Sequence, residues 1–166
     1  MKKIIILIGP PAGGKTEIAF RLARILPKAK AIEVDKIKEQ ISGSVHGKDD
    51  TERELWFKAL NNKIKNLLIK YDNIIVDEGF FKQEYLRKFL KGLEKFKIII
   101  VEISYSLEEH FKRDKKRKGD EPSAVKKMYK LHNSVVGKEK IKPDIIIKDK
   151  DLTVDQVISL IYKKLF

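Results

Sequence analysis

The sequence predicts an α/β fold in which a five-stranded parallel sheet lies between two layers of helices. Two observations lead to this prediction. Short apolar runs rich in isoleucine and valine recur along the chain, and segments with helical spacing of apolar residues separate them. Strands that are apolar along their whole length are typical of parallel sheets covered on both faces. Strands that alternate with helices form such three-layer sheets through right-handed crossovers.

The expected strands are short, and turn residues bound most of them. In chain order they read KIIILIG, KAIEVD, NIIVDEG, KIIIVEIS and DIIIKD, at residues 3–9, 30–35, 73–79, 97–104 and 144–149. Their branched side chains suit a pleated surface that is buried on both sides. The first run resembles a signal peptide, but it is short and leads into glycines and a lysine instead of a small-residue cleavage site. We therefore expect a strand there and a cytoplasmic protein.

Six helices are expected between and after these strands. The first carries Ile18, Leu22 and Leu26 on one stripe, at the spacing of an amphipathic helix. Pro122 suits the first turn of the fifth helix, and Thr153 suits the N-cap of the last. The six ranges are 15–26, 51–70, 82–95, 106–117, 122–136 and 153–165.

Length and composition narrow the class of protein. At 166 residues, without repeat or linker, the chain is expected to form one domain over residues 1–166. Its apolar runs are all shorter than the ~18 residues that cross a bilayer, so we expect no membrane partner. The absence of cysteine excludes disulfides and thiolate metal sites. The net charge of +13 fits a nucleic-acid partner or a lysine-rich, thermophile-like surface, and both interpretations stay open.

A glycine-rich loop follows the first expected strand and leads into the first expected helix. Residues 9–16 read GPPAGGKT and match the P-loop pattern G-x-x-x-x-G-K-[ST] without a mismatch. Glycines let successive N–H groups turn inward around an anion, and the helix start adds further donors. We expect this loop to bind the phosphates of a nucleotide, with lysine on the β- and γ-phosphates and threonine on Mg²⁺. The loop residues are Gly9, Pro10, Pro11, Ala12, Gly13, Gly14, Lys15 and Thr16.

Among P-loop proteins, the chain best fits a small kinase. It has no N-K-x-D guanine signature and no L-S-G-G-Q transporter signature, and it is short for a hexameric motor. Asp35 follows the second expected strand, where it would accept a proton from an acceptor hydroxyl or simply cap a helix. Asp77 ends the third strand, as a Walker-B carboxylate that orients Mg²⁺ does. Glu78 would share that work or face the acceptor.

A basic segment, FKRDKKRKGDEP, places Arg113 and Arg117 one helical turn apart at residues 111–122. Such a pair suits a short helical lid, at about residues 106–122, that closes over ATP. Arginine neutralises charge on the transferred phosphoryl group and stacks on adenine. A solvated basic face or a nucleic-acid patch is the competing interpretation. His46, His110 and His132 show no metal-ligand spacing, so we interpret them as surface or structural residues.

The order of these motifs resembles the small P-loop kinases grouped with polynucleotide kinase and chloramphenicol phosphotransferase, and more distantly the zeta-toxin kinases. The resemblance covers essentially the whole chain and implies a three-layer P-loop NTPase fold with ATP and Mg²⁺ as cofactors. It also implies that Asp35 is the general base. Polynucleotide kinase carries an arginine three residues after this base to grip the acceptor's phosphate. This chain has Lys38 there, which keeps the charge but lacks the bidentate fork.

The leading hypothesis is an ATP-dependent kinase that phosphorylates a hydroxyl of a small molecule, a nucleoside or a nucleic-acid 5′ end. A nucleoside monophosphate kinase is the nearest alternative. Its acceptor is an ionised phosphate, which needs arginine clamps, and apart from the lid pair only Arg53 and Arg87 suit such a role. A non-catalytic, nucleotide-gated RNA-binding protein is the second alternative. The acceptor, the preferred nucleoside triphosphate and the oligomeric state are not readable from the sequence.

Overall fold

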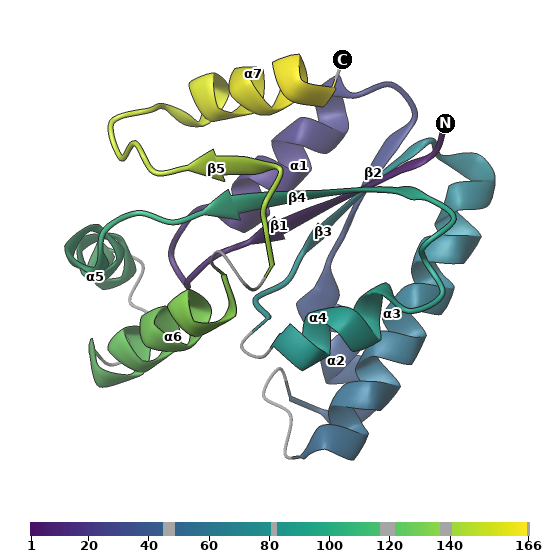
Figure 1. The fold of residues 1–166 in the computed structure, drawn as a ribbon, viewed down its shortest axis with the longest axis horizontal. Helices are drawn as coiled ribbons and strands as arrows, with labels where there is room; N and C mark the ends of the chain where they lie inside the picture. The colour runs from purple at the N-terminus through teal and green to yellow at the C-terminus, as the bar shows by residue number, and fades with distance from the viewer. Residues whose placement is uncertain (45–48, 81–82, 117–121, 137–140, 166) are drawn as a thin grey trace.

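The computed structural model describes residues 1–44, 49–80, 83–116, 122–136 and 141–165. Five parallel strands form one sheet in the order β2-β3-β1-β4-β5. Helices cover both faces of this sheet (Figure 1), so the expected three-layer α/β class is confirmed. The strands are β1 (Lys3–Ile8), β2 (Ala29–Ile32), β3 (Asn73–Asp77), β4 (Lys97–Ile103) and β5 (Ile145–Ile147).

The helices of the described residues fall into three groups. One pair packs on the first face of the sheet and comprises α1 (Lys15–Ile25) and α7 (Val154–Leu165). A second group lies toward the opposite face and comprises α2 (Val34–Ser42), α3 (Asp50–Lys70) and α4 (Gln83–Leu90). Two more helices, α5 (Leu107–Lys116) and α6 (Pro122–Val135), lie near the end toward which the strands point (Figure 1). None of the described helices combines the length and the apolar character that crossing a membrane requires.

The central strand β1 is apolar throughout because both of its faces are buried. Ile4 and Ile6 belong to the core under α3 and α4, whereas Ile5 and Leu7 belong to the core under α1 and α7. All four side chains are fully buried. Alternate residues of a strand point to opposite faces, so a continuous apolar run is what a two-sided core requires. This burial fixes the position of the loop that follows β1.

The largest differences from the expected boundaries concern β2 and α4. The strand expected at 30–35 ends at Ile32, and α2, which the sequence analysis did not predict, begins at Val34. The periodic apolar pattern that would predict α2 is weak, because Val34 is the one buried residue of this helix. The helix expected at 82–95 ends at Leu90, since Gly92 adopts a φ of 86°, which a helix cannot continue. At the last helix, Thr153 and Gln156 form the reciprocal bonds of a capping box, as expected for the N-cap.

Gly9 is the glycine on which the path from β1 into the loop most depends. A Cβ added there would lie 2.1 Å from the backbone oxygen of Ile103, and its φ is +150°. We expect Gly9→Ala to lower the free energy of unfolding by about 3 kcal/mol, because backbone atoms of β4 cannot move aside cheaply. Chemical denaturation measures this. The control is Gly43→Ala, at a φ of +68° in open space, for which we expect only the left-handed cost of about 1–2 kcal/mol. Equal losses in both variants would contradict the steric argument.

Candidate functional site

The glycine-rich loop connects β1 to α1 at the carboxyl end of the sheet. Ala12 has a φ of 60° and Gly14, the residue before α1, has a φ of 78°, so left-handed residues alternate with the others. Such alternation turns consecutive N–H groups toward one side and creates an anion-binding concavity. The side chain of Lys15 folds back over the loop, where its Nζ donates to the carbonyl oxygen of Pro10 at 3.0 Å. The loop therefore has the shape and charge of a phosphate cradle.

Thr16 and Asp77 come together from neighbouring elements. Asp77 ends β3, which pairs with β1 in a register that sets it opposite Leu7. The Thr16 hydroxyl in the first turn of α1 donates to Oδ2 of Asp77 at 2.5 Å. The structure thus brings together the two residues expected at the metal. The pairing follows from the rule that carboxyl ends of parallel strands meet at one edge.

These two side chains fit Mg²⁺ by the chemistry of their oxygens. Mg²⁺ in phosphate-transfer sites keeps several waters and takes one or two protein oxygens besides the substrate phosphates. A threonine hydroxyl and one carboxylate supply that number. Across the described residues, no cluster of three histidine, aspartate or glutamate side chains forms a metal cage. The donor set therefore suits a metal that arrives with nucleotide.

Asp35 lies in the first turn of α2 and lines a cleft beside the loop. This cleft has a volume of about 300 Å³, and Thr16 and Asp77 line it as well. The Asp35 side chain is 76% exposed. The aspartate interpreted as base and the two expected metal ligands therefore open into one cleft. Besides one lysine, Lys36, the charged residues of its wall are the carboxylates Glu33, Asp35, Glu39 and Asp77.

Lys38 and Glu78 form an ion pair behind Asp35. The Lys38 Nζ lies 2.6 Å from Oε2 of Glu78 and 3.8 Å from Oδ1 of Asp35. It also lies over the ring of Trp56, 5.3 Å from the centroid. Both partners of the pair are nearly buried, with side chains 12% and 8% exposed. Burial raises the pKa of Glu78, against the opposing effect of the Lys38 charge.

Of the two arginines expected in the lid, the structure describes Arg113 but not Arg117. Arg113 lies on α5, where its Nε donates to Glu109 at 2.6 Å and its Nη2 to the Lys150 carbonyl at 3.2 Å. Its guanidinium stacks on Tyr105, 4.1 Å from the ring centroid. These contacts hold its guanidinium beside Tyr105 and the segment after β5, and none of the three is with residues 9–16. Arg117 lies outside the described residues, as do His46 and part of the segment expected as a lid.

His110 is the residue of the site that sequence reasoning missed. Of the two interpretations that the sequence offers for it, surface or structural, the structure agrees with the second, because its side chain is fully buried against the loop. Its Nδ1 donates to the carbonyl oxygen of Pro11 at 2.7 Å, and its ring lies near those of Tyr105 and Tyr129. The contact joins residues 99 positions apart. No spacing in the sequence signals such a contact.

The buried His110 predicts a specific pH dependence of stability. Burial, with smaller contributions from Lys15, Arg113 and His132, lowers the pKa of His110 to about 4. The unfolded chain, with a histidine pKa near the ordinary value of 6.5, then binds the proton more tightly than the folded one between pH 6.5 and 4. Stability should fall as pH drops through this window, by roughly 3 kcal/mol in total. The measurement is the difference between the pH–stability curves of the wild type and His110→Phe, and a constant difference would contradict the expectation.

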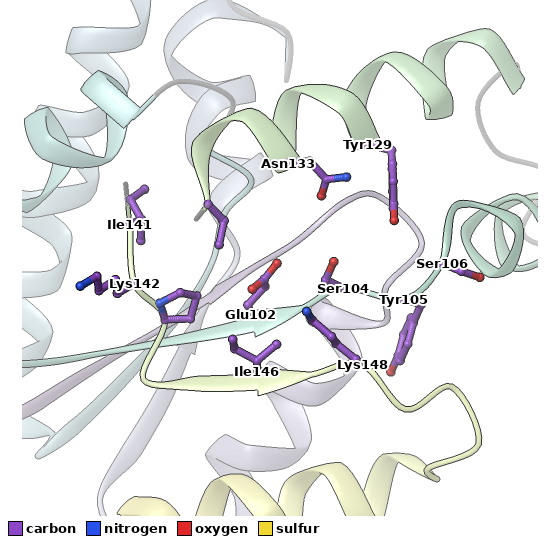
Figure 2. Close-up of a pocket in the computed structure, with 12 residues that line it drawn as sticks. Glu102, Ser104, Tyr105, Ser106, Tyr129, Asn133, Ile141, Lys142, Ile146 and Lys148 are labelled. Carbon is purple, nitrogen blue, oxygen red and sulfur yellow. The ribbon is translucent and has the colours of Figure 1, made fainter. Parts of the chain in front are cut away.

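A larger cavity, whose lining residues Figure 2 shows, shares no lining residue with the cleft at Asp35. It has a volume of about 730 Å³ between α6 and the strands β4 and β5, and neither residues 9–16 nor Asp35 and Asp77 line it. Glu102 lines this cavity, and one of its carboxylate oxygens pairs with Nε2 of His132 at 2.9 Å. The larger cavity is thus lined by Glu102 and two lysines, Lys142 and Lys148, whereas Thr16, Asp35 and Asp77 lie at the smaller cleft.

Comparisons with known proteins agree with this geometry. The model of a family described as an AAA domain matches residues 4–131. A search of curated protein sequences gives no match. Among solved structures, the chain is similar to the tunicamycin resistance protein of Deinococcus radiodurans, with a TM-score of 0.73 and 18% identity over 99% of this chain and 96% of that one. It is also similar to shikimate kinase from Acinetobacter baumannii, with a TM-score of 0.66 and 16% identity over 99% and 93%.

A third similar structure is a chain of the Pnkp1/Rnl/Hen1 RNA repair complex. Its TM-score is 0.68 and its identity 21%, over 92% of this chain. The match covers 51% of that chain, so this protein spans about half of its length. At these identities the likeness concerns the fold. The fold and the P-loop kinase resemblance that the sequence predicts are thereby confirmed.

Proposed function

The chain belongs to the AAA domain family, and on this premise we propose that it is an ATP-dependent kinase that phosphorylates a hydroxyl group. The observation that carries the proposal is that Thr16, Asp77 and Asp35 line one cleft, next to the loop over which Lys15 folds. Lys15 and Thr16 come from the loop and the start of α1, Asp77 from β3 and Asp35 from α2. A phosphate cradle, a metal position and a carboxylate base are the parts that phosphoryl transfer requires.

Each residue has a role in the proposed transfer. The backbone N–H groups of the loop and the ammonium of Lys15 bind and orient the β- and γ-phosphates. Asp35 accepts the proton of the acceptor hydroxyl while the oxygen of that hydroxyl forms a bond to the γ-phosphorus. The bond between the γ-phosphorus and the bridging oxygen breaks, and ADP leaves with that oxygen. Thr16 and Asp77 would hold Mg²⁺, which neutralises charge on the phosphates when it is bound. Arg113, and Arg117 beyond the described residues, would act from the lid.

The charges around the cleft favour a hydroxyl acceptor over a phosphate acceptor. Four of the five charged residues that line it are carboxylates, which repel an ionised phosphate. Lys38, at the position where polynucleotide kinase grips a phosphate, is already paired with Glu78 at 2.6 Å. Both observations speak against a nucleoside monophosphate as acceptor. They also favour an acceptor without a phosphate next to its reacting hydroxyl.

A panel of acceptors tests the proposal. γ-Labelled ATP with Mg²⁺ is offered together with a nucleoside, a sugar alcohol, a 5′-hydroxyl RNA oligonucleotide and a nucleoside monophosphate. We expect label on a hydroxyl-bearing acceptor and none on the monophosphate. Label on the monophosphate alone would replace the proposal by the nucleoside monophosphate kinase. ATP binding without transfer, joined to salt-dependent RNA binding, would favour the non-catalytic alternative.

A further inference from the structure

One side chain outside the loop fixes the direction of a loop peptide. The Nδ1 of His110, on α5, donates to the carbonyl oxygen of Pro11 at 2.7 Å. The peptide bond between Pro11 and Ala12 is trans, so the C=O of Pro11 and the N–H of Ala12 point in opposite directions across one planar unit. A hydrogen bond that holds this oxygen toward His110 therefore turns the Ala12 N–H to the side away from His110.

The same peptide precedes a residue in an unfavourable conformation. Ala12 has a φ of 60°, which costs a residue with a Cβ about 1–2 kcal/mol relative to the right-handed region. A strained loop residue persists only where its surroundings hold it. The bond from His110 is made to the peptide that enters this conformation, so it is placed to hold the loop in this shape.

The burial of His110 has an energetic cost. Its other ring nitrogen, Nε2, is buried and has no hydrogen-bond partner among the described residues. An unsatisfied buried polar atom destabilises a fold, and an apolar ring of similar shape avoids that cost. The flanking rings of Tyr105 and Tyr129, with centroids 5.8 and 5.7 Å away, would pack against such a ring equally well. Packing alone therefore does not explain a histidine at this place.

We propose that His110 is a positioning residue for the nucleotide, which aims the N–H of Ala12 at the phosphates by holding the carbonyl oxygen of Pro11. This role rests on the proposed function in one respect, namely that the loop binds a nucleoside triphosphate. Because His110 lies one helical turn before Arg113 on α5, the same contact also couples the position of that helix to the shape of the loop.

Two variants and one control separate positioning from packing. His110→Phe keeps a planar ring but removes the donor. His110→Asn loses the ring but keeps a side-chain N–H at about the distance of Nδ1 from the backbone. Tyr129→Phe alters a neighbouring side chain and leaves the bond to Pro11 intact. For each variant, the Kd for ATP–Mg²⁺ is measured by calorimetry and the Tm is measured without nucleotide at neutral pH.

For His110→Phe we expect the Kd to rise about tenfold, the order of one lost hydrogen bond, while its Tm stays at or above that of the wild type. His110→Asn should lower the Tm through lost packing but keep the Kd within about threefold of the wild type. Wild-type Kd in His110→Phe, or an equal loss of affinity in both variants, would overturn the positioning role. No ATP binding by the wild type would overturn it as well. ATP binding without transfer to any acceptor would overturn the kinase proposal alone.

Discussion

Asp35→Asn is expected to slow phosphate transfer by about 10²–10⁴-fold, the usual contribution of a general base. Asparagine has nearly the same size as aspartate but cannot accept a proton. The Asp35 side chain is 76% exposed at the cleft, and its ionic contact is with Lys38 at 3.8 Å, so the fold should not depend on it. The Kd for ATP should therefore stay within about twofold, because the carboxylate acts on the acceptor and not on the loop.

The matched control for this variant is Asp72→Asn. Asp72 is an exposed carboxylate at the opposite end of the sheet, just before β3, and its Oδ2 lies 3.9 Å from the Nζ of Lys28. It should leave both the rate and the affinity unchanged. Rates are compared by single-turnover transfer at saturating ATP, so that slow product release does not hide the chemical step. Wild-type turnover by Asp35→Asn would remove Asp35 from the role of base.

Lys15→Met is expected to be the second large effect, with transfer slowed by about 10²–10³-fold. Methionine keeps much of the length of the side chain and removes its charge. The Lys15 ammonium folds over the loop onto Pro10, which places it where the terminal phosphates would lie. The Kd for ATP should rise more than the Kd for adenosine, because only ATP presents phosphates to this charge.

An exposed lysine on α3 provides the control for the loss of charge. Lys63→Met removes the same charge far along the chain from the loop and should change neither rate nor affinity. If Lys15→Met bound ATP and transferred phosphate as the wild type does, the nucleotide would not be held by this loop. The proposed mechanism would then lose its starting point.

Local signals made the phosphate loop and its setting predictable. The apolar run of β1 is bound to be buried on both faces, and the glycines after it have few other uses in that order. The contact between Thr16 and Asp77 could also be predicted from the sequence. Parallel strands end at one edge, so a residue after β1 and a residue at the end of β3 must meet.

Contacts between elements that are far apart in the chain could not be predicted from the sequence. The ion pair of Lys38 with Glu78 and the contact of Lys38 with the ring of Trp56 join α2, the residue after β3, and α3, and no spacing in the sequence encodes how these elements pack. The contact of His110 with Pro11 has the same origin. The helix α2 was missed for a related reason, since a short helix with one buried residue has almost no apolar period to detect.

The most direct test of the account uses ATP whose γ-phosphate carries ¹⁸O, incubated with Mg²⁺, the protein and a mixture of small metabolites. Mass spectrometry identifies the compounds that acquire the heavy phosphoryl group, and ³¹P NMR distinguishes phosphate esters from anhydrides. We predict a heavy phosphate ester that forms at least about 10²-fold faster with the wild type than with Asp35→Asn. Heavy label found only in nucleoside diphosphates, or an ester formed equally well by both proteins, would contradict the account.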